Sequence, residues 1–258
     1  MKVALIFSGQ PRFVKECAPY LIENIVSKYD VDVFAHLWFD ENLLKTPYKY
    51  EGNWPTQTIS PNALETFKEL YNPIGLEVEE SMSFQDDSMD FEASMRKYND
   101  WATPNAPDNM KNGTKGFMNL IKSNQISYFY SLNKANLLKK KFEYQNNFKY
   151  DWVIRARTDT APHTPLELSN YNPNAVTYTN INNQESVTPG LICDWLNFGN
   201  SYVMDVFNSC FPCYDHLIEE CKRTNNGAWS PELVHRKMVD LYKVKAEGHS
   251  IPVSLPRF

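Results

Sequence analysis

Residues 150–159 restrict the fold of this chain more than any other segment. Residues 152–154 are apolar without polar alternation, which is typical of a strand that is buried on both faces of a sheet. The segment then turns polar, with Arg155, Arg157 and Asp159 standing where an apolar run would continue. Because ligands of open α/β sheets bind beyond the carboxyl ends of the strands, we expect this strand to end at a binding site. The alternative is an ion pair that caps an ordinary strand.

The amino terminus shows the same change of character. Residues 1–7 form an apolar run, and the polar stretch Ser8-Gly9-Gln10-Pro11-Arg12 follows it directly. This pattern predicts a first strand whose loop presents backbone donors, a hydroxyl, an amide and a guanidinium group to a nucleotide base, ribose or phosphate. A single glycine cannot supply a dinucleotide fingerprint or a Walker loop, so neither is predicted. The alternative is a simple turn at a strand end.

The remaining patterns alternate between helical and strand character. In chain order they predict a helix over 14–28, a strand over 31–38, a helix starting at Ser60-Pro61, a strand over 75–78, a helix over 122–142, a strand over 175–178, a strand over 191–199 and a helix starting at Ser230-Pro231. Helices placed between strands connect parallel neighbours, so we expect an α/β fold with a mostly parallel central sheet flanked by helices. The polar segment 80–116 interrupts this order, and we read it as a lid or a surface insertion, with Tyr98 and Trp101 suited to stacking on a sugar.

Three stretches together resemble the small GT-A glycosyltransferases of bacterial polysaccharide loci and large DNA viruses: residues 8–12, residues 150–159 and the Asp-Trp-Leu-Asn-Phe-Gly run at 194–199. The resemblance implies one GT-A-like, Rossmann-like domain over residues 1–258. Its nucleotide-binding part would end near residue 160, and the acceptor side would follow. It also implies an enzyme that moves a sugar from a nucleoside-diphosphate sugar to a hydroxyl of a glycan or glycoprotein.

The resemblance further implies a divalent metal ion. In that family the corresponding strand ends in an Asp-x-Asp motif that binds the metal of the nucleotide sugar. Here Arg157-Thr158-Asp159 stands in that place, so only Asp159 carries over as a ligand of Mn²⁺ or Mg²⁺. His249 is the second candidate ligand, as a histidine near the C-terminus is in some GT-A enzymes. The alternative for His249 is an ordinary loop residue.

Contacts with the nucleotide-sugar donor follow from the same resemblance. The implied donor-binding residues are Ser8, Gly9, Gln10, Arg12, Gln125, Ser131, Lys134, Arg155, Arg157 and Asp159. Gln125, Ser131 and Lys134 enter this set because the helix before the metal strand lines the donor cleft in similar enzymes. Lys134 is equally well explained as a solvated charge on the helix surface.

Two carboxylates are candidates for the catalytic base that removes the proton of the acceptor hydroxyl. Asp194 is the first candidate, because it interrupts an apolar strand pattern, and its alternative is a helix cap or a strand-end ion pair. Glu232 is the second candidate, although a glutamate in the first turn of a helix is electrostatically favourable without any catalytic role.

Composition excludes several other classes of protein. The formal net charge of −5 argues against a general nucleic-acid binder. No apolar run approaches the roughly 20 residues of a membrane span, and the first run is too short for the core of a signal peptide. The five cysteines are an odd number without a convincing metal-binding pattern, which favours free thiols in a reducing compartment. We therefore expect a cytoplasmic protein, in bacteria or in the host if a virus encodes it.

Two other functions stay open from the sequence. A non-catalytic protein that binds carbohydrate or nucleotide would keep the cleft without turnover, and the incomplete acid motif favours it. A glycoside hydrolase would require two opposed carboxylates at a defined separation.

Overall fold

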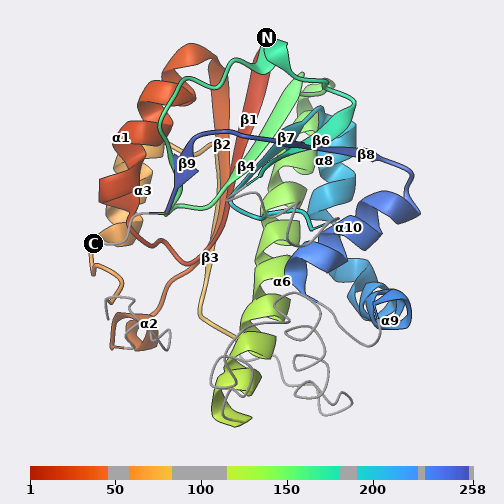
Figure 1. The fold of residues 1–258 in the computed structure, drawn as a ribbon. Coiled ribbons are helices and arrows are strands. Elements are labelled where there is room, and N and C mark those ends of the chain that lie inside the picture. The colour runs from red at the N-terminus through yellow and green to blue at the C-terminus, as the bar shows by residue number, and fades with distance from the viewer. Residues whose placement is uncertain (46–57, 83–114, 181–190, 226–229, 256–258) are drawn as a thin grey trace.

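The computed structural model describes residues 1–45, 58–82, 115–180, 191–225 and 230–255, with side chains of the long central helix from residue 125 onward. This part of the chain forms an α/β domain in which a seven-stranded central sheet packs against helices (Figure 1). Tyr98 and Trp101, which we expected to stack on a sugar, lie outside the described residues.

The central sheet is mixed but mostly parallel, as predicted. Its strand order is β3-β2-β1-β4-β7-β6-β8. The strands are β1 (Lys2–Gly9), β2 (Asp30–Trp38), β3 (Gly75–Glu79), β4 (Trp152–Ala156), β6 (Ala175–Thr179), β7 (Leu196–Gly199) and β8 (Lys245–His249). Only β7 among them runs antiparallel to both of its neighbours. A second, two-stranded sheet joins β5 (Ala161–Pro162) to β9 (Val253–Ser254).

Helices cover both faces of the central sheet (Figure 1). The α-helices of the described chain are α1 (Val14–Asn24), α2 (Glu41–Lys45), α3 (Ala63–Tyr71), α6 (Lys115–Asn146), α8 (Ser201–Asn208), α9 (Tyr214–Thr224) and α10 (Pro231–Leu241). Short 3₁₀ turns occupy Val26–Lys28, Leu168–Asn170 and Phe211–Cys213. Helices α1 and α3 pack on one face of the sheet, and α6, α8 and α10 contribute to the core on the other. None of the helices in the described ranges combines the length and apolar character needed to cross a membrane.

Burial on both sides explains the apolar run of β1. Val3, Leu5 and Phe7 belong to the core beneath α1 and α3, whereas Ala4 and Ile6 belong to the core beneath α6 and α8. All five residues are fully buried. A strand covered on both faces has no solvent side, and so it shows no polar alternation.

Several predicted boundaries differ from the observed ones. The first helix ends at Asn24 and continues only as a 3₁₀ turn, because Ile25 leaves the helical conformation with φ −132°. The second helix starts at Ala63, since Ser60 and Pro61 form the turn that precedes it. At the last helix the prediction is confirmed, because the Ser230 hydroxyl caps α10 by accepting from the amide of Leu233. All five cysteines are free thiols, also as expected.

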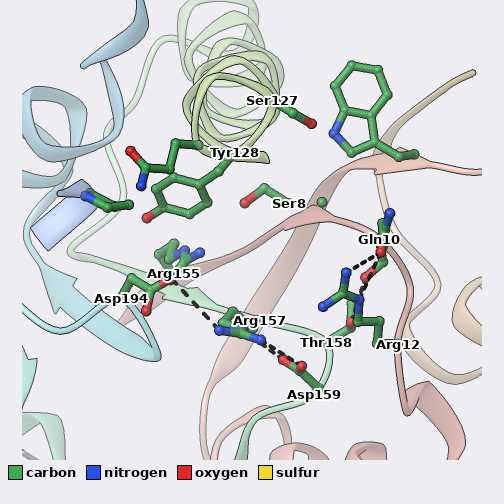
Figure 2. Close-up of a pocket in the computed structure, with 14 residues that line it drawn as sticks. Ser8, Gln10, Arg12, Ser127, Tyr128, Arg155, Arg157, Thr158, Asp159 and Asp194 are labelled. Carbon is green, nitrogen blue, oxygen red and sulfur yellow. Dashed lines mark hydrogen bonds and ion pairs between the residues drawn. The ribbon is translucent and has the colours of Figure 1, made fainter. Parts of the chain in front are cut away.

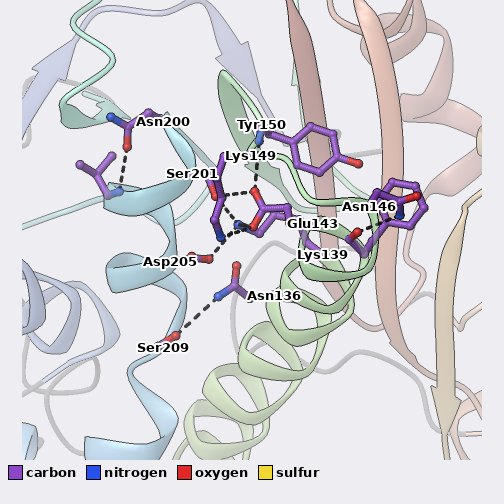
Figure 3. Close-up of polar contacts among 12 residues, drawn as sticks. Asn136, Lys139, Glu143, Asn146, Lys149, Tyr150, Asn200, Ser201, Asp205 and Ser209 are labelled. Atoms are coloured by element: carbon purple, nitrogen blue, oxygen red, sulfur yellow. Dashed lines mark hydrogen bonds and ion pairs between the residues drawn. The ribbon is translucent and has the colours of Figure 1, made fainter.

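A buried polar network fixes the position of α6 (Figure 3). Lys139 Nζ lies 3.1 Å from Glu143 Oε2 and donates to Ser201 Oγ at 2.7 Å and to Asp205 Oδ1 at 2.8 Å. Glu143 Oε1 accepts from the Ser201 hydroxyl at 2.6 Å and from the amide of Tyr150, just before β4, at 3.1 Å. The side chains of Lys139 and Glu143 are completely buried. The network therefore ties α6 to α8 and to the entry of β4.

Candidate functional site

A cleft of about 290 Å³ opens at the carboxyl edge of the central sheet (Figure 2). Its walls come from the ends of β1, β2 and β4, from α6, from the segment before β7 and from the start of α10. The structure brings nine of the predicted site residues to this cleft: Ser8, Gly9, Gln10, Arg12, Gln125, Arg155, Arg157, Asp159 and Asp194. Four others, Ser131, Lys134, Glu232 and His249, are not among the residues that line it.

Strand pairing explains why distant segments meet here. β1 and β4 are parallel neighbours, with Phe7 opposite Ala156, so their polar continuations leave the sheet side by side. The Thr158 hydroxyl then donates to the carbonyl oxygen of Gln10 at 3.1 Å and joins the two loops. β7 runs the other way and starts opposite Ala156, so that Asp194, two residues before the strand, reaches the same edge.

The loop after β1 depends on Gly9 and on a buried serine beneath it. Gly9 has φ 99°, a conformation that side chains disfavour, and its amide donates to Ser131 Oγ at 2.7 Å. The Ser131 hydroxyl donates in turn to the carbonyl oxygen of His36 at 3.0 Å. Ser131 is fully buried. The structure thus places Ser131 under the loop, where it shapes the site from behind instead of lining it.

Lys134 and His249 also lie apart from the cleft lining. Lys134 Nζ is 2.6 Å from Glu77 Oε1 and 3.2 Å from Glu79 Oε1, and the hydrogen bond to Glu77 raises its pKa. His249 ends β8, three strands away from β4, which corresponds to about 14 Å at the usual strand spacing. Its Nε2 lies 3.6 Å from Glu247 Oε2. The structure therefore does not bring His249 to Asp159, because the intervening strands separate them.

Arg155 is the most unusual group in the cleft. It is only 1% exposed, and its Nε and Nη1 have no hydrogen-bond partner among the residues that the structure describes. Its guanidinium lies over the ring of Tyr128, with Cζ 5.0 Å from the ring centroid. Buried charges in proteins are normally paired, because desolvation of an unpaired charge is unfavourable. A buried guanidinium with unused donors therefore indicates a place for an anionic ligand.

Arg157 and Asp159 form a two-pronged ion pair at the floor of the cleft (Figure 2). Arg157 Nε donates to Asp159 Oδ1 and its Nη2 donates to Oδ2, each at 2.8 Å. Burial opposes ionisation of Asp159, but the charge and hydrogen bonds of Arg157, with the charge of Arg12, lower the pKa of the carboxyl below its ordinary value. On the other side, Arg157 Nη1 lies 3.9 Å from Asp194 Oδ2. Arg12 also donates to the Gln10 side chain, from Nε at 2.8 Å.

These residues do not fit the divalent-metal site that the sequence resemblance implies. Both oxygens of Asp159 already accept hydrogen bonds from Arg157, and the charge of Arg12 also acts on this carboxylate. Within the described ranges, no group of three or more His, Cys, Asp or Glu side chains is arranged to hold a metal ion. A hard cation would have to displace the guanidinium of Arg157 from both oxygens of Asp159, which leaves Asp194 as the other carboxylate among the described lining residues.

Asp194 and Glu232 form an acidic corner next to the arginines. The amide of Ile192 donates to the carbonyl oxygen of Glu232 at 3.5 Å, which joins the start of α10 to the segment that carries Asp194. Burial and the nearby charge of Asp194 raise the pKa of Glu232 above its ordinary value. The two carboxyl groups therefore differ in their environments, as groups with separate acid and base roles do. We expected Asp194 to lie within a strand over residues 191–199. The strand β7 starts only at Leu196, so Asp194 lies in the segment before it.

Five residues that sequence reasoning did not assign to the site also line the cleft: Trp38, Ser127, Tyr128, Thr158 and Pro231. Thr158 lies inside the strand-end motif itself, and Ser127 and Tyr128 follow Gln125 within one helical turn. Trp38 is the last residue of β2, at the same sheet edge as the loop after β1. This position at a strand end is the sequence signal that could have placed Trp38 in the cleft. Its buried Nε1 has no partner in the described part of the chain.

Comparison with models of protein families found no match for this chain, and comparison with curated proteins found no similar sequence either.

Proposed function

We propose that this protein is a nucleotide-sugar-dependent glycosyltransferase with a GT-A-like domain. It would move a sugar from a nucleoside diphosphate to a hydroxyl of a glycan or glycoprotein acceptor. The observation that carries the proposal is Arg155, a buried guanidinium with unused donors, beside two more arginines at the carboxyl edge of a mostly parallel sheet. This is where α/β sheets bind nucleotides.

The arginines supply what the departing nucleoside diphosphate needs. As the bond between the sugar and the diphosphate breaks, negative charge grows on the leaving oxygen. Arg155 and Arg157 would donate hydrogen bonds to the diphosphate, and such charge-assisted bonds strengthen as the acceptor oxygen becomes more negative. Arg12 would add a third positive charge next to the diphosphate, from the loop after β1. The guanidinium fork matches phosphate geometry better than a lysine does.

Neutral polar groups around the arginines suit the nucleoside and the sugar. Ser8 Oγ, Trp38 Nε1 and Gln125 Oε1 are buried cleft atoms without a hydrogen-bond partner among the described residues. Buried polar atoms of native proteins are normally satisfied, so these three predict bonds to a bound ligand. They include donors and an acceptor, as the hydroxyl and carbonyl groups of a nucleotide sugar require.

The acceptor hydroxyl would be activated by the acidic corner, Asp194 and Glu232. Asp194 is our first choice for the base that takes the proton of the acceptor hydroxyl, because it lines the cleft and lies 3.9 Å from Arg157. Glu232 does not line the cleft, but burial and the charge of Asp194 raise its pKa and favour its protonated form beside that base.

A glycoside hydrolase is the second candidate, and the same acidic corner favours it. Glycoside hydrolysis uses two carboxyl groups, and burial raises the pKa of one of this pair, Glu232, as suits a general acid. A neutral glycoside, however, would leave the Arg155 donors that have no partner among the described residues without an anionic ligand. The guanidinium groups therefore favour the transferase.

One experiment tests both candidates. The protein is incubated with a panel of nucleoside-diphosphate sugars, with water or simple glycosides as acceptors, and the released nucleoside diphosphate is measured. A parallel reaction contains glycosides alone, and the release of reducing sugar is measured. We expect nucleoside diphosphate from one class of donor and no reducing sugar from the glycosides. The opposite result would replace the transferase by the hydrolase.

A further inference from the structure

We infer that the cleft holds a diphosphate through guanidinium groups without a divalent cation, and that Asp159 serves as the positioning residue of Arg157. This inference rests on the proposed function, since it concerns how the same cleft binds its nucleotide. It assigns to Asp159 a role different from the metal ligand that the sequence suggests.

The first argument is the way in which Asp159 is already used. Each of its oxygens accepts one hydrogen bond from Arg157, from Nε and from Nη2, both at 2.8 Å. The carboxylate is 7% exposed and lies at the floor of the cleft, beneath the guanidinium (Figure 2). A two-pronged pair of this kind fixes the plane of a guanidinium, because both bonds must lie in that plane.

The second argument is the direction in which Arg157 then points. The pair occupies the edge of the guanidinium formed by Nε and Nη2, and the Nη1 end extends toward Asp194, at 3.9 Å from Oδ2. Figure 2 shows Arg157 between the two carboxylates of Asp159 and Asp194. Asp159 therefore holds Arg157 with one end directed at the space where a ligand would lie.

The third argument is the charge of the lining. Among the described residues, Arg12, Arg155 and Arg157 share the cleft lining with two carboxylates, Asp159 and Asp194, so this lining carries an excess of positive charge without any metal. Arg155 adds two buried donors that the described residues leave unused. An anion with several oxygens satisfies these donors directly. A divalent cation would instead meet three guanidinium groups and a carboxylate that is already paired.

The test measures binding, so that it does not depend on knowing the donor sugar or the acceptor. Uridine, guanosine, adenosine, cytidine and thymidine diphosphates are titrated into the whole protein by calorimetry, once with EDTA and once with Mn²⁺. We expect at least one of them to bind with the same affinity in both conditions. Arg157→Gln should weaken that binding roughly ten- to a hundredfold.

A double-mutant cycle then isolates the role of Asp159. As a single variant, Asp159→Asn should weaken nucleotide binding by the same factor with EDTA and with Mn²⁺. Added to Arg157→Gln, it should have no further effect on binding. Glu220→Gln and Arg223→Gln are matched controls, because Arg223 forms the same two-pronged pair with Glu220 on an exposed helix surface. These controls should leave binding unchanged.

Three outcomes are distinct. Binding that ignores Mn²⁺, with an Asp159 effect that vanishes in the Arg157→Gln background, supports the inference. Binding that needs Mn²⁺ and is lost in Asp159→Asn overturns it and leaves the proposed glycosyltransferase standing. No binding of any nucleotide in either condition overturns the proposed function, and the inference with it.

Discussion

The guanidinium of Arg155 lies over the ring of Tyr128, and the Tyr128 oxygen lies 2.7 Å from His235 Nε2. Burial and the charge of Arg155 lower the pKa of His235 well below its ordinary value, so its ring is neutral, and Nε2 shares a hydrogen bond with the tyrosine hydroxyl. The ring of Phe207 stacks on the other side of His235, with centroids 3.9 Å apart. The cleft arginine is therefore positioned from α10 through an aromatic side chain of α6.

The first prediction concerns the buried charge of Arg155. Arg155→Met should leave the unliganded protein within about 1 kcal/mol of the wild-type free energy of unfolding, or above it, because it removes a buried charge whose Nε and Nη1 have no hydrogen-bond partner among the described residues. The same variant should weaken binding of nucleoside diphosphate roughly ten- to a hundredfold. Urea unfolding and calorimetry measure the two effects. A large loss of stability with unchanged binding would mean that Arg155 is a structural residue.

The second prediction is a pH dependence of stability caused by His235. The folded-state pKa of His235 lies below the ordinary histidine value of about 6.5, so in acid the unfolded chain binds more protons than the folded chain. The stability that neutral His235 provides is thus present above about pH 6.5 and decreases as the pH falls below it. His235→Asn should make the free energy of unfolding depend less on pH between about 5 and 7. Identical pH slopes in the two proteins would contradict a neutral, buried His235.

The third prediction separates the two carboxyl groups of the acidic corner. Asp194→Asn should lower acceptor-dependent turnover by about 10²–10⁴-fold and leave donor affinity almost unchanged, as expected for a general base. Glu232→Gln should have the smaller effect on turnover. A normal rate in Asp194→Asn beside a collapsed rate in Glu232→Gln would reverse these assignments, and normal rates in both would remove the general base.

The fourth prediction concerns the buried network of α6. Lys139→Met should lower the free energy of unfolding by about 1–3 kcal/mol, because Ser201 and Asp205 lose their buried donor, whereas Glu143 keeps its ion pair with Lys149 at 2.8 Å. Lys45→Met is the matched control, since Lys45 forms the same i,i+4 pair with Glu41 while both side chains are mostly exposed. The control should change stability by less than about 0.5 kcal/mol. Equal effects in urea unfolding would show that the network does not hold α6.

Local patterns predicted the elements that build the cleft. The apolar runs of β1 and β4 and the polar residues that follow them indicated two strands that end at one site. The serine and proline before α10 indicated a helix start. These predictions succeeded because burial on both faces and helix capping leave a signal within a few neighbouring residues. Trp38 and Tyr128 were missed, since an aromatic residue at a strand end or on an apolar helix face looks like any other core residue.

Sequence alone thus determined that the chain forms an α/β fold with charged groups at strand ends. Tertiary structure decided which of those groups meet. The antiparallel direction of β7 brings Asp194 to the cleft from before its strand, whereas two strands, β7 and β6, lie between β4, which Asp159 follows, and β8, which His249 ends. The tertiary structure also decided that Asp159 pairs with Arg157. It buries Arg155 so that Nε and Nη1 have no hydrogen-bond partner among the described residues. Strand order and direction depend on contacts between segments far apart in the chain, and these contacts leave no pattern within any one segment.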